Sequence, residues 1–176
     1  MKSKAVFLDR DGVINEDKGY VHKIEDFRVF PGVFEALKKL KQSDFKLVIV
    51  TNQSGIGRGY YSEQDYLELT EQIIKIFKQQ DIEFDDILYC PHSPDENCDC
   101  RKPSPKLFLD AIKKFNLVPD NCWIIGDKFS DVKPAEKIGC KSILIKSSYT
   151  EKLTDNNLLT AKDLYEAVEI ILSKND

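Results

Sequence analysis

The first apolar run of the chain stops abruptly at two carboxylates, Asp9 and Asp11. Its four apolar residues, 5–8, are too few for a helix and rich in strand formers, which predicts a strand buried on both faces. Groups that follow such a strand lie in the crevice where open α/β sheets bind ligands. Period-two alternation points both carboxylates the same way, and their repulsion favours a divalent cation, most readily Mg²⁺ with oxygen ligands. A turn followed by a helix cap is the alternative, since Asp and Gly are common turn residues.

Length and charge limit the class of protein. A chain of 176 residues, 41% of them hydrophobic, can close one sizeable core, so we expect a single domain over residues 1–176. The net charge of −4, the pI near 5.3 and the absence of a basic run argue against nucleic acid as a partner. No window approaches a membrane span or a signal core, so we expect a soluble, cytoplasmic protein without a membrane partner. We also expect a monomer.

Four further apolar runs are short and unalternated in the same way, which is typical of strands in a parallel sheet covered on both faces. They cover residues 46–51, 87–90, 122–127 and 142–145. Segments with helical spacing occupy residues 33–40, 62–77, 104–115, 130–138 and 163–172. Strands that alternate with helices in this way predict a doubly wound, Rossmann-like α/β domain.

Cap residues set the ends of several predicted helices. Ser62 and Thr160 each begin a predicted capping box, and Pro105 is expected at the first helical position of its helix. Gly139 is a natural left-handed end for the helix over 130–138. The loop over residues 11–31 is too long for a simple turn, and loops of that length usually serve function. We interpret it as a flap over the site.

Polar side chains follow nearly every predicted strand at the same end. A carboxylate such as Asp9 can attack phosphorus in line if cations and neutral donors hold the equatorial oxygens, and Asp127 can complete a magnesium shell. Asp11 can protonate the leaving oxygen and then deprotonate the attacking water. The candidate donors and cations at these strand ends are Thr51, Asn52, Gln53, Ser54, Arg101, Lys102 and Lys128.

Three cysteines and a histidine crowd into residues 90–100. Cys90, His92, Cys98 and Cys100 supply the complete ligand set of a tetrahedral zinc with no open position, which predicts a structural site. Loop cysteines beside a solvated histidine are the alternative. Since Arg101 and Lys102 follow the last ligand directly, the metal would fix a loop that presents two cations to the substrate.

Four motifs in order resemble the haloacid-dehalogenase-type phosphatases. They are Phe-Leu-Asp-Arg-Asp-Gly from residue 7, Val-Thr-Asn-Gln-Ser-Gly-Ile from 50, Cys-Asp-Cys-Arg-Lys-Pro from 98 and Ile-Gly-Asp-Lys from 125. The resemblance covers residues 5 to about 145 and implies a sheet ordered 5-4-1-2-3, with the first strand central and no large cap domain.

The resemblance also implies a role for each motif residue. Asp9 would be the nucleophile that forms an aspartyl-phosphate, and Asp11 the general acid and base. Mg²⁺ would be held by Asp9, Asp127 and the backbone carbonyl of Asp11. Thr51 and Lys102 would bind the transferring phosphoryl group, Lys128 would lie beside it, and members of the family carry zinc at the cysteine loop.

Within the family, the flap and the glycine-rich run at 54–59 resemble the branch that removes the C7 phosphate of D-glycero-D-manno-heptose 1,7-bisphosphate, in the synthesis of nucleotide-activated heptose for lipopolysaccharide. This likeness adds Asp17, Gly19, Tyr20 and Arg58 to the candidate substrate contacts. A bisphosphate needs a second cationic anchor, and by position Arg58 and Arg101 are the candidates.

Three alternatives stay open. Histidinol-phosphatases carry a similar zinc loop, and Ser104-Pro105-Lys106 departs from the proline-glycine-methionine stretch common in the family. A polynucleotide 3′-phosphatase is disfavoured by the acidic pI. A non-catalytic zinc-containing binding module would lack an acid/base or a magnesium ligand, and none is missing.

Overall fold

A computed structural model describes residues 3–147 and 158–174. Within them, one sheet holds six strands in the order β3-β2-β1-β4-β5-β6, with every neighbouring pair parallel. The strands are β1 Ala5–Leu8, β2 Lys46–Asn52, β3 Asp86–Cys90, β4 Trp123–Gly126, β5 Lys141–Ile145 and β6 Leu159–Ala161. The predicted order of the five main strands is confirmed, and β1 lies between β2 and β4. The sixth strand, at the edge beside β5, was not predicted.

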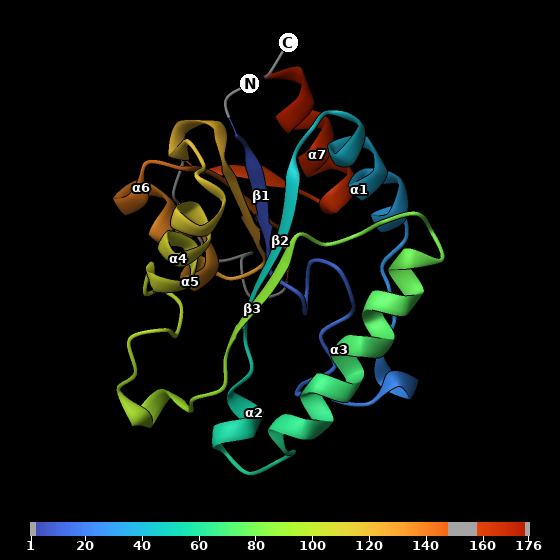
Figure 1. Ribbon diagram of the computed structural model, residues 1–176, viewed down its shortest axis with the longest axis vertical. Coiled ribbons are helices and arrows are strands. Elements are labelled where there is room, and N and C mark those ends of the chain that lie inside the picture. The colour runs from blue at the N-terminus through green and yellow to red at the C-terminus, as the bar shows by residue number, and fades with distance from the viewer. Residues whose placement is uncertain (1–2, 148–157, 175–176) are drawn as a thin grey trace.

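Helices cover both faces of the sheet (Figure 1). On one face lie α1 Val33–Gln42, α3 Glu63–Lys78 and α7 Leu164–Ser173. On the other face lie α4 Lys106–Phe115 and α6 Pro134–Ile138. The described residues also form two short helices, α2 Ser54–Gly57 and α5 Phe129–Val132. Helix α1 packs on α7. None of the helices in the described ranges is long and apolar enough to cross a bilayer.

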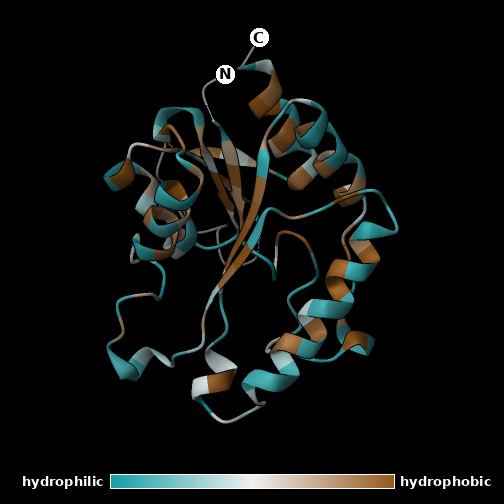
Figure 2. Cartoon of the chain, in the orientation of Figure 1, coloured by the Kyte–Doolittle hydropathy of each residue, from teal (hydrophilic) through white to brown (hydrophobic). Residues whose placement is uncertain are grey.

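Strand β1 explains why the apolar runs do not alternate. Val6 and Leu8 pack into the core beneath α1, α3 and α7, whereas Ala5 and Phe7 pack into the core beneath α4. Because both faces are covered, both sets of side chains on β1 are apolar, and the middle of β2 is hydrophobic in the same way, whereas its first residue is hydrophilic (Figure 2). The central strand is therefore rigidly buried, and the residues that follow it start from a fixed position.

One predicted helix and two predicted helix starts were wrong. The helix predicted over 130–138 is two short helices, α5 and α6, because Pro134 cannot donate the backbone hydrogen bond that would continue α5. Thr160 lies in β6, and the side chain of Asp163 caps α7 instead by accepting from the Glu166 backbone N–H. Pro105 precedes the first helical residue of α4 rather than occupying it.

The other two caps were predicted correctly. Ser62 and Asp65 form a reciprocal capping box at the start of α3. Gly139 ends α6 in the left-handed conformation, with φ of 76°.

Candidate active site

A cavity of about 320 Å³ opens at the carboxyl ends of β1 and β2. It gathers most of the residues predicted from the sequence, from five separate segments of the chain. The predicted residues that line it are Asp9, Asp11, Asp17, Gly19, Tyr20, Thr51, Asn52, Gln53, Ser54, Arg101, Lys102 and Lys128. Tyr61, Ser130 and Asp131 also line it, and none of these three was predicted.

Asp9 follows the last residue of β1 and is held there by backbone pairing, because its N–H donates to the carbonyl of Ile125 in β4 at 3.0 Å. Its Oδ1 accepts a hydrogen bond from Lys102 Nζ at 2.9 Å. Burial, reinforced by the negative charge of Asp131, raises the pKa of Asp9 from 3.8 to about 8, although Lys102 acts in the opposite direction. An isolated anion is therefore costly at this position without further positive charge.

Lys102 joins two carboxylates in the interior. Its Nζ lies 2.8 Å from Asp131 Oδ1 and also donates to the backbone carbonyl of Val50 at 2.7 Å. Burial alone would lower the pKa of Lys102, but Asp131 and Asp9 together raise it, so the ammonium stays charged. Asp131 uses its other oxygen to accept from the Lys128 N–H at 3.0 Å, which caps α5. Both oxygens of Asp131 thus orient other groups.

A second carboxylate next to Asp9 has an oxygen with no partner. Within the described part of the chain, Asp127 Oδ1 is buried and makes no hydrogen bond. Gly12 approaches so closely that a Cβ added there would stand 2.3 Å from Asp127 Oδ2. Burial raises the pKa of Asp127 to about 6, against the effect of Lys128. Carboxylate oxygens of Asp9, Asp127 and Asp131 lie within 4.8 Å of one another, and this hard oxygen donor set fits a magnesium ion.

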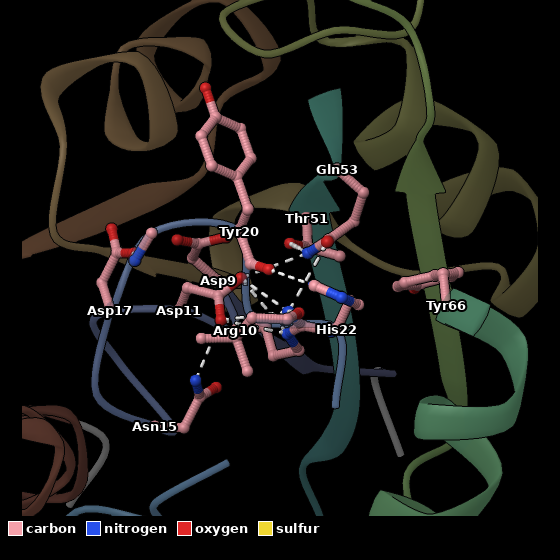
Figure 3. A network of polar contacts seen from close by, with 12 residues as sticks. Asp9, Arg10, Asp11, Asn15, Asp17, Tyr20, His22, Thr51, Gln53 and Tyr66 are labelled. Atoms are coloured by element: carbon pink, nitrogen blue, oxygen red, sulfur yellow. Dashed lines mark hydrogen bonds and ion pairs between the residues drawn. The ribbon is translucent and has the colours of Figure 1, made fainter. Parts of the chain in front are cut away.

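Asp11 is held by hydrogen-bond donors on both oxygens (Figure 3). Arg10 donates from Nη2 and Nε at 2.9 to 3.3 Å. Asn15 Nδ2 donates to Oδ1 at 2.9 Å, and Gln53 Nε2 donates to Oδ2 at 3.2 Å. The side chain of Asp11 is still 17% exposed, so the carboxyl group is oriented yet reachable from the cavity.

The polar residues at the end of β2, Thr51 and Asn52, and Gln53 after it build the cavity wall rather than all facing a ligand. Gln53 donates to Thr51 Oγ1 at 2.9 Å and accepts from Tyr61 at 2.7 Å, so both ends of its amide have protein partners. Asn52 pairs with the backbone of Lys102 in both directions, at 3.0 and 3.3 Å. Asn52 therefore fixes the loop that carries Lys102.

The flap over residues 11–31 reaches the cavity through its turn. Asp17 accepts from the Gly19 N–H at 3.0 Å and from Lys128 Nζ at 3.1 Å. Although burial opposes it, these contacts lower the pKa of Asp17. Tyr20 follows with φ of 53° and packs edge-on against Tyr60, with ring centroids 4.8 Å apart. The ion pair and the ring contact close the turn against the body of the domain.

The two predicted distal anchors differ in position. Arg101 lines the cavity, and its Nη1 is buried without a hydrogen-bond partner in the described residues. Arg58 follows α2, is exposed and is not among the residues that line the cavity. The geometry therefore favours Arg101 over Arg58 as a contact for a ligand in this cavity.

The four predicted zinc ligands lie together where β3 ends. Cys90 Sγ is 3.5 Å from Cys98 Sγ and 2.9 Å from Cys100 Sγ. His92 Nδ1 is 3.5 Å from Cys90 Sγ and 3.3 Å from Cys100 Sγ. Ligands about 2.3 Å from a tetrahedral zinc stand about 3.8 Å apart. The four atoms lie close enough together to be a candidate ligand set for one metal ion.

The arrangement has the parts needed for transfer of a phosphoryl group. It presents a buried carboxylate beside an ammonium group, a second carboxyl group within reach of the cavity and a group of oxygen donors for a divalent cation. Asp131 is the one strongly placed member that the sequence analysis did not identify. Its position three residues after Lys128, which is the spacing of a capping box, is the signal that could have indicated it.

Comparison with known proteins agrees with this geometry. A family model described as haloacid dehalogenase-like hydrolase matches residues 4–139. The chain is 42% identical over 170 residues to D-glycero-beta-D-manno-heptose-1,7-bisphosphate 7-phosphatase of Helicobacter pylori, covering 96% of this chain and 98% of that one. It is 50% identical over 133 residues, 76% of each chain, to D-glycero-alpha-D-manno-heptose-1,7-bisphosphate 7-phosphatase of Campylobacter jejuni.

A solved structure is similar over nearly the full length. It is D,D-heptose 1,7-bisphosphate phosphatase from B. bronchiseptica, complexed with magnesium and phosphate. The TM-score is 0.89 at 28% sequence identity, and the match covers 98% of this chain and 99% of that chain. The match therefore extends from the central sheet through the flap and the cysteine loop.

Proposed function

Because the chain belongs to the haloacid dehalogenase-like hydrolase family, we propose that it hydrolyses the C7 phosphate ester of D-glycero-D-manno-heptose 1,7-bisphosphate and keeps the C1 phosphate. The observation that carries the proposal is the convergence of Asp9, Asp11 and Lys102 on one cavity that also contains Arg101. Two of these groups serve the reacting phosphate, one serves the leaving oxygen, and Arg101 remains for a second phosphate.

In the first half of the reaction, an oxygen of Asp9 attacks phosphorus and forms an aspartyl-phosphate. The bond from phosphorus to the sugar oxygen breaks, and Asp11 gives its proton to that oxygen, so the sugar leaves as a neutral alcohol. In the second half, Asp11 takes a proton from water, and the water oxygen attacks phosphorus. Inorganic phosphate is released and Asp9 is regenerated as a carboxylate.

The surrounding residues hold the phosphoryl group during both steps. Lys102 neutralises charge on the phosphoryl oxygens, and Thr51 donates a hydrogen bond to them. Mg²⁺, when bound by Asp9, Asp127 and the backbone carbonyl of Asp11, supplies the positive charge that lets an anionic nucleophile approach an anionic phosphate. The unpartnered Asp127 oxygen and the buried carboxylates around it support this ligand set.

Selectivity for a bisphosphate requires a cation away from the reacting phosphorus. Arg101 supplies it, since this residue lines the cavity and its buried Nη1 has no hydrogen-bond partner among the described residues. A charge-assisted pair contributes about 1.5 to 3 kcal/mol, or roughly 10- to 150-fold in specificity. Arg58, the other anchor expected from the sequence, serves as the matched comparison because it is an exposed arginine outside the cavity.

Zinc at Cys90, His92, Cys98 and Cys100 has a structural role in this proposal. The ligand distances and the closed, four-donor set support zinc rather than a catalytic ion with an open position. The ion would hold the loop that continues directly into Arg101 and Lys102. We further propose that the enzyme acts as a cytoplasmic monomer, where a reducing environment keeps the three thiols available to the metal.

The proposal is tested by phosphate release from a substrate panel. The panel contains both C1 anomers of the heptose bisphosphate, histidinol phosphate and a 3′-phosphorylated oligonucleotide, each assayed with Mg²⁺ and with a chelator. We expect preference for a heptose bisphosphate and loss of activity on chelation. Preference for histidinol phosphate would overturn the substrate, and activity on nothing in the panel would favour a binding module.

The same panel separates the two arginines. Arg101→Ala is expected to lower kcat/KM for the bisphosphate roughly 10- to 150-fold while changing that for a simple monophosphate little. Arg58→Ala is expected to leave both close to wild type. The reverse pattern would return the distal anchor to Arg58, and equal losses on both substrates would place the arginine in the chemistry or the fold.

A further inference from the structure

Arg10 lies between the two reacting aspartates in sequence, yet it does not line the cavity. Its side chain is only 3% exposed. Nε and Nη2 both face the carboxylate of Asp11, and Nη2 lies 2.9 Å from Oδ2 and 3.1 Å from Oδ1. A side-on contact between a planar guanidinium and a carboxylate fixes the rotation of the carboxylate as well as its position.

The same nitrogen also holds the flap. Arg10 Nη2 donates to the backbone carbonyl of Val21 at 2.7 Å, across eleven residues of sequence. Val21 is buried in the core, and it directly follows Tyr20, which lines the cavity. One guanidinium group therefore contacts both the carboxyl group of Asp11 (Figure 3) and the backbone that places the edge of the cavity.

Burying a guanidinium group for packing alone is costly, since an isolated charge loses its hydration and gains nothing in return. Asp11 offsets this cost, and Arg10 in turn limits how Asp11 can turn. Asn15 and Gln53 also donate to the Asp11 oxygens, but they are neutral and each makes a single contact with the carboxylate. Arg10 is the contact that fixes the plane of the carboxyl group.

We propose that Arg10 is a positioning residue of the reaction, which holds the Asp11 carboxyl group and the flap backbone at Val21 as one unit. The proton donor and the edge of the cavity are thereby set together. This inference rests on the proposed function, because it requires Asp11 to give a proton to the leaving oxygen. It does not depend on the identity of the sugar.

A comparison of two leaving groups shows whether Arg10 positions Asp11 for the reaction or only supports the fold. A p-nitrophenolate ion departs without a proton, whereas phenolate departs far less readily and needs one. Values of kcat/KM for p-nitrophenyl phosphate and phenyl phosphate report the steps up to this departure. Arg10→Gln is expected to lower the value for phenyl phosphate at least about 10-fold more than the value for p-nitrophenyl phosphate, as is Asp11→Asn.

A double variant tests whether the two residues act as a unit. If Arg10 acts through Asp11, the double variant with Arg10→Gln and Asp11→Asn has a kcat/KM for phenyl phosphate no lower than that of Asp11→Asn alone. Arg10→Lys keeps the charge but cannot make the two-point contact. We therefore expect kcat/KM for phenyl phosphate to fall more than that for p-nitrophenyl phosphate, as in Arg10→Gln, but by a smaller factor. This variant serves if Arg10→Gln does not fold, as judged by near-UV circular dichroism.

Arg28→Gln is the matched control, since Arg28 lies at the far end of the same loop and is exposed, and among the described residues its side chain donates a hydrogen bond only to the carbonyl of its neighbour Phe27. We expect wild-type values on both esters. Equal losses on the two esters in folded Arg10 variants, or losses that multiply with Asp11→Asn, would overturn the inference. A wild-type enzyme that cleaves both aryl esters but not heptose bisphosphate would instead contradict the proposed substrate and leave the test of Arg10 intact.

Discussion

The ammonium nitrogen of Lys102 lies 2.9 Å from Oδ1 of Asp9, although the two residues are 93 positions apart in sequence. Both side chains are buried, at 1% and 9% exposure. Asp9 directly follows the central strand, and Lys102 follows the cysteine loop, so this contact connects the loop to the middle of the sheet. The geometry of the Asp9 carboxylate therefore depends on a segment outside the sheet.

Replacing Lys102 with methionine is expected to lower both activity and stability. The change leaves Asp9 and Asp131 facing each other in the interior without their shared cation. Breaking a buried pair in this way costs roughly 3 kcal/mol or more, which urea unfolding measures directly. Lys106→Met is the control, because the ion pair of Lys106 with Asp110 is on the surface, and we expect no change there. Equal unfolding midpoints for the two variants would contradict the role of Lys102.

Asp9→Asn is expected to abolish turnover while the protein stays folded, because an amide cannot attack phosphorus but keeps the volume of the side chain. Asp11→Asn should lose about 10²- to 10⁴-fold in kcat, since both proton transfers depend on it. Steady-state rates with circular dichroism as the check on folding test both variants. Substantial turnover by Asp9→Asn, free of wild-type enzyme, would remove Asp9 from the mechanism.

The raised pKa of Asp9 predicts how the stability of the metal-free protein depends on pH. Its pKa is about 8 in the folded protein and near 3.8 in the unfolded chain, so the folded state favours the protonated acid. The contribution of the Asp9 carboxyl group to the free energy of unfolding is fully present below about pH 4, and it is lost as the pH rises towards 8. In the presence of a chelator, Asp9→Asn should therefore match wild type near pH 4 and exceed it increasingly up to pH 8, by at most about 6 kcal/mol.

Thermal or urea unfolding of the two proteins at pH 4, 6 and 8 measures this difference. Addition of Mg²⁺ at pH 8 should stabilise wild type more than Asp9→Asn, because the cation offsets the buried negative charge. A difference between the two proteins that does not change with pH would contradict the burial of an unfavourable charge at Asp9.

The cysteine cluster predicts one tightly held zinc per chain. Elemental analysis of protein purified without chelators should return about one zinc that excess Mg²⁺ does not displace. Cys98→Ser should lose zinc and raise KM before it unfolds the sheet, because the loop lies outside the strands. Cys140→Ser removes a cysteine outside the cluster and should keep both the metal and KM. Absence of zinc from the wild-type protein would contradict the assignment of the cysteine cluster as a zinc site.

Much of the fold could be predicted from local patterns. The unalternated runs identify strands covered on both faces, and β1 shows why, since Val6 and Phe7 belong to opposite cores. Strand β6 escaped prediction because it is three residues long and two of them are exposed, so it forms no apolar run. Thr160 was assigned to a cap for the same reason, as its place in the sheet depends on pairing with Leu144.

The site was predictable where a residue lies at the carboxyl end of a strand, as Thr51 does, or directly after it, as Asp9 does. Asp131 was not identified, because it lies on a short helix and its importance comes from its contact with Lys102, which is distant in sequence. Position beside the glycine-rich run suggested Arg58, but adjacency in sequence does not determine the direction of an exposed side chain. Such relationships depend on tertiary contacts that no local pattern contains.

The central claim is that this enzyme removes the C7 phosphate of a heptose 1,7-bisphosphate through Asp9. The most direct measurement is a phosphorus NMR time course of the bisphosphate with enzyme and Mg²⁺, with Asp9→Asn as the parallel sample. The account predicts that the C7 phosphate resonance is replaced by inorganic phosphate, that the C1 phosphate persists, and that the Asp9→Asn sample does not change. Loss of the C1 phosphate first, or no loss from wild type, would contradict it.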